Sequence, residues 1–263
     1  MCLISLLYEE HAEHRLVLAA NRDEFFARPT LPAHRWREAP HLVAGRDLRG
    51  GGTWMGCTQG GRFCAITNYR DPAEHRDDVP SRGGIVSGFL TSTLSARSFA
   101  KRLRQTRHAY NAYNLLLMDE EELVYLSSIQ DRIEPLSSGL YGLSNEHLDT
   151  PWPKVTHTRT ALRRLASSGD IREEALFKML RNETKAEKDR LPDTGVDPEL
   201  EHALSSVFIA TPSYGTRASS VVLVDYAGHI SFSERTFDAR GDLQTSRAFR
   251  LNEKHIAGSY PTF

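Results

Sequence analysis

The sequence predicts an α+β fold: a four-layer αββα sandwich in which two mostly antiparallel sheets lie face to face and helices cover both outer faces. Strand-like and helix-like segments come in long separate runs, in the order strands, helices, strands, helices, strands, which favours α+β layering over alternating βαβ units. Short turn signals between neighbouring strands indicate hairpins, whose strands pair antiparallel. No proline- or glycine-rich linker separates two cores, so we expect residues 1–263 to form one domain.

The first hairpin is expected at the N-terminus. Met1–Tyr8 is an apolar run with the length of a buried strand, and Glu9–His14 is a polar loop. Arg15–Ala20 predicts the second strand, which Asn21–Glu24 follows directly. The first run has no basic segment before it, no long apolar stretch and no small-residue cleavage site. It does not resemble a secretory signal, so we expect the chain to begin at its first strand.

The middle of the chain contains a further hairpin and the helices. Three prolines between residues 29 and 40 predict an irregular stretch, because proline cannot donate to a strand ladder. A glycine turn at residues 60–61 predicts a hairpin with strands Thr53–Thr58 and Arg62–Asn68. Apolar residues at helical spacing predict helices within Ser81–Leu94, Ser95–Gln105, Trp152–Leu165 and Ile171–Leu180.

The remaining strands are short apolar runs bounded by turn residues. We expect them at Tyr113–Met118, Leu123–Ser127, Arg132–Leu136, Leu140–Ser144, Val207–Ala210, Ser220–Asp225 and His229–Glu234. Asn182–Pro198 is charged and predicts a surface loop, and the polar tail from Ala239 is expected to cap a sheet edge or to wander.

The composition narrows the classes of function. Lysine and arginine number 33 against 34 aspartates and glutamates, a formal charge of −1, which argues against non-specific nucleic-acid binding. No apolar run approaches the roughly 20 residues that cross a bilayer, so no transmembrane segment is expected. Three cysteines do not make a disulfide framework and indicate a reducing compartment, the cytoplasm. Cys57 and Cys64 have the wrong spacing for a zinc knuckle, and neither a metal nor a cofactor is expected.

Cys2 is the most informative residue. Methionine aminopeptidases remove Met1 when the second residue is small, and cysteine is small enough. A chain that begins at Cys2 carries a thiol and an α-amine on one residue, and this amine, with an ordinary pKa of about 7.7–8.0, can take the proton of the thiol. The alternative is that Cys2 is one more buried residue of an apolar strand, since free cysteine is often buried.

Four polar residues after the second strand provide candidate partners for Cys2. Strand alternation points Arg22 and Glu24 to one face, and it points Asn21 and Asp23 to the other. A carboxylate on Asp23, beside the first strand, can hold the α-amine of Cys2. The alternative is a polar turn with an arginine–carboxylate pair.

Asparagine amides at two other strand ends are candidate oxyanion donors. Asn68, within Thr67–Tyr69, and Asn145 each end a strand, and an amide can donate hydrogen bonds to a developing oxyanion. Each alone also fits a turn or cap residue. Arg217 follows Tyr214–Thr216 before a late strand and can bind a carboxylate or phosphate of a substrate. The alternative there is a solvated arginine beside a glycine turn.

These residues together resemble the NRDE family, the transport and Golgi organisation protein 2-like proteins. The resemblance rests on islands of sequence that run in order along nearly the whole chain. They are Met1-Cys2, Ala20–Phe25, Arg28-Pro29, Gly51–Gly56, Thr67–Tyr69, Arg82-Gly83, Tyr113-Asn114, Leu143–Asn145 and Tyr214–Arg217.

The NRDE pattern is similar to N-terminal-nucleophile (Ntn) hydrolases, in particular the choloylglycine hydrolase and penicillin V acylase group. This similarity implies an αββα sandwich whose nucleophile is the cysteine after the initiator methionine. Asp23 then falls on the aspartate that holds the amine, and Asn68 and Asn145 fall on the two oxyanion donors. Ala20 stands where those enzymes carry an arginine, so either Arg22 substitutes for it or the catalytic set is incomplete.

The resemblance implies a cysteine hydrolase or acyltransferase that acts on a linear amide or related acyl compound, with Cys2 as nucleophile. The residues predicted to bind this substrate are Arg22, Glu24, Trp54, Tyr69 and Arg217. A second hypothesis is a non-catalytic carrier or chaperone of an apolar ligand such as haem or an acyl lipid, in which Cys2 or a histidine is at most a ligand. A third is a structural protein that kept the fold and lost the activity, which Ala20 favours.

Overall fold

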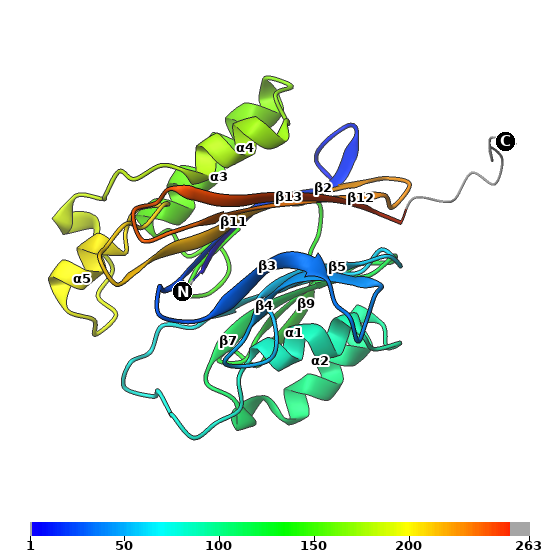
Figure 1. The fold of residues 1–263 in the computed structure, drawn as a ribbon, viewed down its shortest axis with the longest axis horizontal. Helices are drawn as coiled ribbons and strands as arrows, with labels where there is room; N and C mark the ends of the chain where they lie inside the picture. The colour runs from blue at the N-terminus through cyan, green and yellow to red at the C-terminus, as the bar shows by residue number, and fades with distance from the viewer. Residues whose placement is uncertain (1, 253–263) are drawn as a thin grey trace, which may run out of the picture.

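Two antiparallel sheets face each other in the computed structural model, which describes residues 2–252 (Figure 1). The first sheet has the strand order β10-β1-β2-β11-β12-β13, with bounds Gly139–Leu143, Cys2–Tyr8, His14–Phe25, Tyr214–Asp225, Ile230–Phe237 and Leu243–Leu251. The second has the order β3-β4-β5-β6-β7-β8-β9, with bounds Thr30–Arg35, Leu42–Asp47, Met55–Thr58, Phe63–Asn68, Tyr113–Met118, Leu123–Ser127 and Arg132–Pro135. This arrangement confirms the predicted α+β fold class.

Helices cover the outer face of each sheet, which gives the four layers αββα (Figure 1). Their bounds are α1 Gly83–Leu90, α2 Ala96–Gln105, α3 Pro153–Ser167, α4 Glu173–Leu180 and α5 Pro198–Ala203, with 3-10 turns at Arg107–Ala109 and Lys188–Arg190. Helix α3 packs on β1 and β10, and α4 packs on β2 and β11, whereas α1 and α2 pack on the second sheet. Helix α2 follows the predicted cap, because the hydroxyl of Ser95 accepts the N–H of Ser98.

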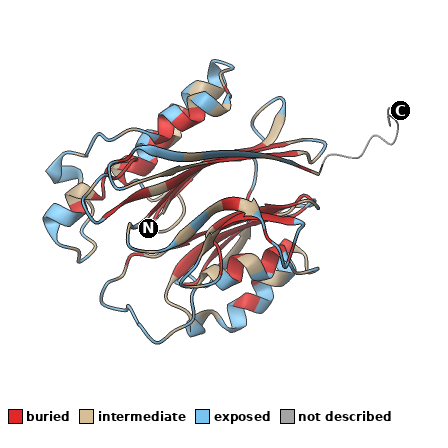
Figure 2. Ribbon diagram, viewed as in Figure 1, coloured by how far each residue is buried: buried red, intermediate tan, exposed pale blue. Residues whose placement is uncertain are grey.

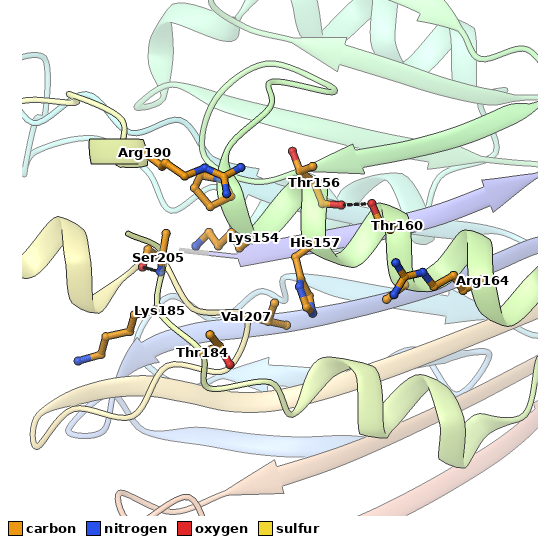
Figure 3. A pocket seen from close by; sticks show the side chains of 13 residues that line it. Lys154, Thr156, His157, Thr160, Arg164, Thr184, Lys185, Arg190, Ser205 and Val207 are labelled. Carbon is orange, nitrogen blue, oxygen red and sulfur yellow. Dashed lines mark hydrogen bonds between the residues drawn. The ribbon is translucent and has the colours of Figure 1, made fainter. Parts of the chain in front are cut away.

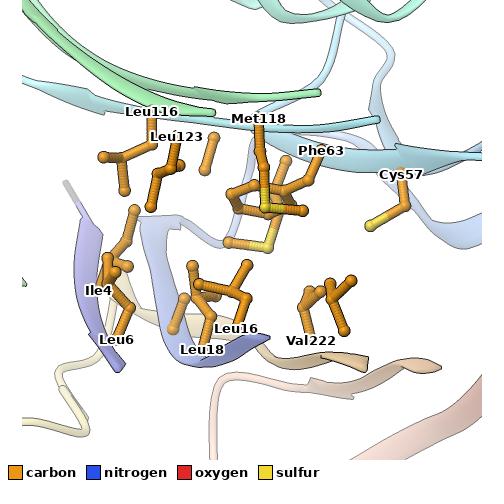
Figure 4. Close-up of a cluster of buried hydrophobic side chains, with 14 of the residues drawn as sticks. Ile4, Leu6, Leu16, Leu18, Cys57, Phe63, Leu116, Met118, Leu123 and Val222 are labelled. Carbon is orange, nitrogen blue, oxygen red and sulfur yellow. The ribbon is translucent and has the colours of Figure 1, made fainter. Parts of the chain in front are cut away.

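Apolar side chains from both sheets fill the space between them, so the buried residues concentrate there and on the inner faces of the helices (Figure 2). The inward-facing residues labelled in Figure 4 are Ile4, Leu6, Leu16, Leu18 and Val222 from the first sheet and Cys57, Phe63, Leu116, Met118 and Leu123 from the second. The alternate residues Leu7, Val17 and Ala19 pack in another cluster with α3 and α4. The two-residue period of a strand therefore divides β1 and β2 between two cores, which explains their continuous apolar runs.

Strand β2 is longer than predicted and includes Asn21–Glu24. It pairs with β1 as far as Arg22, which lies opposite Cys2. It pairs with β11 as far as Phe25, which lies opposite Tyr214. The polar motif therefore lies within the sheet, where the ladder with β11 fixes which way each of its side chains points.

The prediction of an irregular stretch over residues 29–40 is wrong, because strand β3 lies within it. Strand β4 was not predicted from the sequence. Strand β3 is an edge strand, where proline removes no interior ladder bond. The register with β4 shifts around Pro32. Within this shift the N–H of Ala33 donates to Oε1 of Glu234 on β12 at 2.6 Å, so a side chain of the other sheet satisfies it.

The prediction of a strand over Val207–Ala210 is also wrong. Within the described part of the chain this segment has no strand and makes a single bridge at Ala210. The carbonyl oxygen of Val207 accepts a hydrogen bond from the side-chain amide of Asn21 at 2.8 Å. The segment thus satisfies its buried backbone through side chains and a single bridge to Gly215 of β11, without forming a strand ladder.

The polar tail from Ala239 caps a sheet edge, one of the two expected outcomes. It forms strand β13, which pairs with β12 and is mostly exposed. Polar residues suit an edge strand because they oppose pairing with other chains. Residues 253–263, the end of this tail, lie outside the described part.

Trp54 joins the two cores of the second sheet, since its ring packs against the cluster between the sheets and against the cluster beneath α1 and α2. Gly45 on β4 leaves room for this ring. A Cβ atom at Gly45 would lie 2.3 Å from Cη2 of Trp54. No real side chain tolerates so short a contact, so this position requires glycine.

Gly45→Ala is expected to lower the free energy of unfolding by about 1–3 kcal/mol, because either Trp54 or strand β4 must move. Gly84→Ala is the control, since a Cβ atom at Gly84 meets nothing within 4 Å. Urea unfolding followed by tryptophan fluorescence measures both variants. Equal stability of the two would contradict the close contact between Gly45 and Trp54.

Candidate active site

Cys2 is the first residue of β1 and lies opposite Arg22 of β2. Its carbonyl oxygen accepts a hydrogen bond from Oγ of Ser144, at the end of β10 on the other side, at 3.0 Å. By strand alternation the half-buried thiol points toward the second sheet. Together with Arg22 and Trp54 it lines a cavity of about 10 Å³, the size of one water molecule.

The surroundings of Cys2 hold its thiol in the protonated form. Burial raises the pKa of Cys2, and the carboxylates of Asp23 and Glu24 raise it further, while Arg22 opposes them. The thiolate is the nucleophilic form of cysteine, and a raised pKa makes it scarce near neutral pH. Cys2 therefore needs a base close to it in order to react at neutral pH.

Asp23 lies one residue beyond the Cys2–Arg22 pair, and its carboxyl group is buried on the face of β2 opposite to Arg22. Thr216, its partner on β11, donates a hydroxyl hydrogen bond to Oδ1 of Asp23 at 2.7 Å. Burial raises the pKa of Asp23, while the charges of Lys154 and Arg22 and the hydroxyl of Thr216 oppose this effect. The carboxyl group is thus oriented by one strand and surrounded by cations.

Lys154, in the first turn of α3, acts on this carboxyl group from the helix layer. Its side chain is buried, and Nζ donates to the carbonyl oxygen of Leu204 at 3.1 Å. Burial lowers the pKa of Lys154 from 10.5 to about 8, while the negative charges of Asp23 and Cys2 raise it. A buried cation and a buried carboxyl group therefore influence each other between β2 and α3.

Asn68 and Asn145 contact each other at the ends of β6 and β10, which belong to different sheets. The side-chain amide of Asn145 donates to the carbonyl oxygen of Asn68 at 2.9 Å, and the N–H of Arg70 donates to the carbonyl oxygen of Asn145 at 2.7 Å. Asn145 also directly follows Ser144, which binds the carbonyl oxygen of Cys2. A side-chain amide carries two donor hydrogens, so the bond to Asn68 leaves one for another acceptor.

Arg22 and Glu24 share the inward face of β2 with Ala20. The guanidinium of Arg22 lies over the ring of Trp54 at 4.2 Å, 3.7 Å from Oε2 of Glu24 and 3.8 Å from Oδ2 of Asp47. Ala20 is buried in the core between the sheets. The side chain of Arg22 is therefore on the same face of the sheet as Ala20 and the thiol. It lies two residues after Ala20 along β2.

Tyr69 and Arg217, two of the predicted substrate-binding residues, make hydrogen bonds to other groups of the protein. The hydroxyl of Tyr69 donates to Oε1 of Glu146 at 2.6 Å, and its ring centroid lies 5.1 Å from that of His147. Nη1 of Arg217 donates to three carbonyl oxygens, those of Phe25, Phe26 and Arg28, at 3.0–3.3 Å. Arg217 thus fixes the segment after β2, and its role in binding a substrate stays a prediction.

Comparison with known proteins identifies the family. Residues 1–239 match the family described as Transport and Golgi organisation 2. The chain belongs to this family. The Transport and Golgi organization protein 2 homolog of Bos taurus is 33% identical over 276 residues, covering 95% of this chain and 99% of that protein. The Homo sapiens homolog is 32% identical, covering 90% of this chain and 93% of its own. These names state no reaction.

A solved structure shows the same fold. The C2A mutant of the conjugated bile acid hydrolase from Clostridium perfringens superposes with a TM-score of 0.54, covering 99% of this chain and 95% of that one, at 8% sequence identity. At so low an identity the likeness concerns the fold alone. The family member described here therefore has the fold of Ntn hydrolases, as the resemblance in the sequence implied.

Three further residues belong to the electrostatic surroundings of Cys2, and sequence analysis assigned none of them a role. They are Lys154, Arg82 and Tyr214. Burial lowers the pKa of Arg82, which the charge of Cys2 raises, and burial raises the pKa of Tyr214, as do Asp23 and Cys2. Arg82 and Tyr214 stand in the family islands, which is the signal that could have found them. Lys154 has no such signal, because a lysine in an amphipathic helix suggests the solvent-exposed face.

Among residues 2–252 no group of histidine, cysteine, aspartate and glutamate side chains is arranged to hold a metal ion. None of the helices described is both long and apolar enough to cross a membrane. All three cysteines are free thiols.

Two charge-removing substitutions are expected to shift the reactivity of Cys2 in opposite directions. Arg22→Gln removes a charge that lowers the pKa of the thiol, and Glu24→Gln removes one that raises it. Alkylation of Cys2 by iodoacetamide should therefore require higher pH in Arg22→Gln and lower pH in Glu24→Gln than in the unchanged chain. Peptide mapping across a pH series measures this, with the buried Cys57 and Cys64 as internal controls. A shift of the alkylation pH in the same direction for both variants would contradict the opposite effects of Arg22 and Glu24 on the pKa of Cys2.

Lys154→Met tests the buried ammonium group through the pH dependence of stability. The folded-state pKa of Lys154 is about 8, below its ordinary 10.5, so between these values the unfolded chain binds more protons and the wild type gains stability as pH rises. The variant lacks this gain. Its stability relative to the wild type should fall by about 2 kcal/mol from about pH 7.5 to about pH 10. Urea unfolding measures the difference, and Lys101→Met, on the exposed face of α2, is the control. A difference independent of pH would refute the low pKa.

Proposed function

We propose that this chain is an Ntn cysteine hydrolase or acyltransferase that acts on a linear amide or a related acyl compound. It becomes active when Met1 is removed in the cytoplasm. The observation that carries the proposal is the register of β1 and β2, in which Cys2 lies opposite Arg22. This register supports the proposal that Asp23, the residue after Arg22, holds the amine of a chain that begins at Cys2.

In the proposed reaction Sγ of Cys2 attacks the carbonyl carbon of the substrate, and its proton passes to the α-amine of the same residue. Asp23 holds that amine, while the amides of Asn68 and Asn145 donate to the oxyanion. The ammonium group returns the proton to the leaving amine as the C–N bond breaks, which leaves a thioester on Cys2. Water then hydrolyses the thioester with the amine as base. An alcohol or amine in place of water gives acyl transfer.

Three features support this mechanism. The raised pKa of Cys2 means that the thiol needs a base, and an α-amine with an ordinary pKa of about 7.7–8.0 is suited to neutral pH. The hydrogen bond from Thr216 fixes the orientation of the Asp23 carboxyl group. A fixed orientation is required if this carboxyl group is to position the amine. The side-chain amide of Asn145 donates to the carbonyl oxygen of Asn68, beside the residue that binds the carbonyl oxygen of Cys2.

The substrate is proposed to bind beside the thiol of Cys2. The cavity there has room for one water molecule, so a larger substrate requires residues that line it to move. The proposed binding residues are Arg22, Glu24, Trp54, Tyr69 and Arg217. A carrier of haem or an acyl lipid is the alternative, and no contact among residues 2–252 favours it. A Soret band that saturates on haem titration and disappears in Cys2→Ala would favour the carrier.

The N-terminal amine is tested by separating it from the thiol. A chain produced in the cytoplasm of a cell is expected to lack Met1, which intact-mass measurement can show. A β-lactone probe that acylates cysteine nucleophiles should then modify Cys2 and spare the buried Cys57 and Cys64. Inserting one glycine between Met1 and Cys2 keeps the thiol but moves the α-amine to the glycine. This variant is expected to lose the modification, as Cys2→Ala does.

Two further variants complete the test of the mechanism. Asn145→Ala is expected to slow acylation of Cys2 by about 10²–10³-fold, because one oxyanion donor is lost. Cys64→Ala should keep the rate of the unchanged chain, since this thiol lies in the core beneath α1 and α2. Acylation of the glycine-insertion variant at the rate of the mature chain would refute the role of the amine, whatever the substrate.

A further inference from the structure

A second pocket lies on the helix side of the first sheet, between α3 and the segments 184–190 and 205–207 (Figure 3). Its volume is about 330 Å³, within the range of pockets that bind small molecules. Only Lys154 belongs both to this pocket and to the surroundings of Cys2. The proposed hydrolase does not use the rest of the pocket.

The pocket carries an excess of positive charge. Its lining includes Lys154, Arg164, Lys185 and Arg190 together with His157, and it includes no aspartate or glutamate. The ion pairs found among the described residues involve none of these side chains, whereas the neighbouring Lys188 pairs with Glu199 at 2.6 Å. The formal charge of the whole chain is −1, so this excess is local.

Hydrogen bonds within the protein fix the walls of the pocket. The N–H of Ala186 donates to Oγ of Ser205 at 2.9 Å, and the N–H of Phe208 donates to the carbonyl oxygen of Asn182 at 2.7 Å. These bonds hold the two loop segments together against α3. The shape of the pocket therefore does not depend on a ligand to assemble it.

The cations are spread along the pocket. Figure 3 shows Lys154 and Arg190 toward one end, Arg164 at the other, and the ring of His157 between them, with Lys185 at the rim. The hydroxyls of Thr156 and Thr160 lie on the same helix face. A single carboxylate would leave most of these cations without a partner. Phosphoryl groups carry more charge and several acceptor oxygens each, and arginine binds them with two donors at once.

We propose that this pocket binds a phosphorylated anion, with Arg190 and Lys154 at one end and Arg164 at the other. The ligand carries at least two negatively charged phosphoryl oxygens and enters past Lys185. Its phosphoryl group belongs either to a soluble molecule or to the headgroup of a lipid, and both present the same oxygens to the arginines. This site shares only Lys154 with the surroundings of Cys2, and the test below leaves Lys154 unchanged, so either proposal can fail without the other.

Binding of inorganic pyrophosphate to the full chain, measured by calorimetry, tests the site. The wild type is expected to bind it saturably, and more weakly as salt is added. The double variant Arg164→Gln, Arg190→Gln should bind at least about tenfold more weakly, because it loses two charge-assisted contacts. Both residues are exposed, so the variant is expected to fold.

The matched control is Arg102→Gln, Arg163→Gln, which removes the same charge from exposed positions that do not line this pocket. It should bind pyrophosphate as the wild type does. Co-sedimentation with phosphatidylcholine vesicles containing phosphatidic acid distinguishes the sources: retention lost only in the pocket variant indicates a lipid headgroup, and pyrophosphate binding without retention indicates a soluble ligand. Equal weakening in both double variants, or no saturable binding of either probe, would overturn the proposal.

Discussion

The antiparallel register of β1 and β2 is the constraint on which the candidate site depends. A slip of one residue would turn Cys2 away from the second sheet and put Leu3 there instead. The two cores prevent this slip, because Ile4 must face the core between the sheets while Leu7 and Val17 must face α3 and α4. The position of a reactive thiol is thus set by apolar residues that take no part in its chemistry.

The same alternation separates two charged clusters across one strand. Arg22 and Glu24 face the second sheet, on the side of the thiol, whereas Asp23 faces the helix layer with Lys154. Burial raises the pKa of Cys2, and carboxylates of both clusters raise it further, Asp23 more than Glu24, while Arg22 opposes them. Under the proposed function Asp23 therefore both orients the amine and helps to hold the thiol protonated.

Most of the fold could be predicted from the sequence because apolar strands buried on both faces are continuous runs. Strands β7 and β8 have the predicted bounds for this reason. Strand β3 was not predicted because its segment contains proline, and β13 was not predicted because its segment is polar. Both are edge strands, which do not need a continuous apolar run. In the site, alternation predicts the opposite directions of Arg22 and Asp23. The burial of Lys154 could not be predicted, because only the packing of α3 on β1 and β10 decides which helical lysine is enclosed.

Burial alone does not distinguish Cys2 from the other two cysteines. It raises the pKa of Cys57 and Cys64 as well, and those thiols lie in apolar cores with no base beside them. What sets Cys2 apart is its place directly after Met1, at the strand end where Asp23 is buried. Under the proposed function the loss of one residue supplies a base to a thiol that is otherwise held protonated. The chain with Met1 in place would then be an inactive form, and processing would act as its switch.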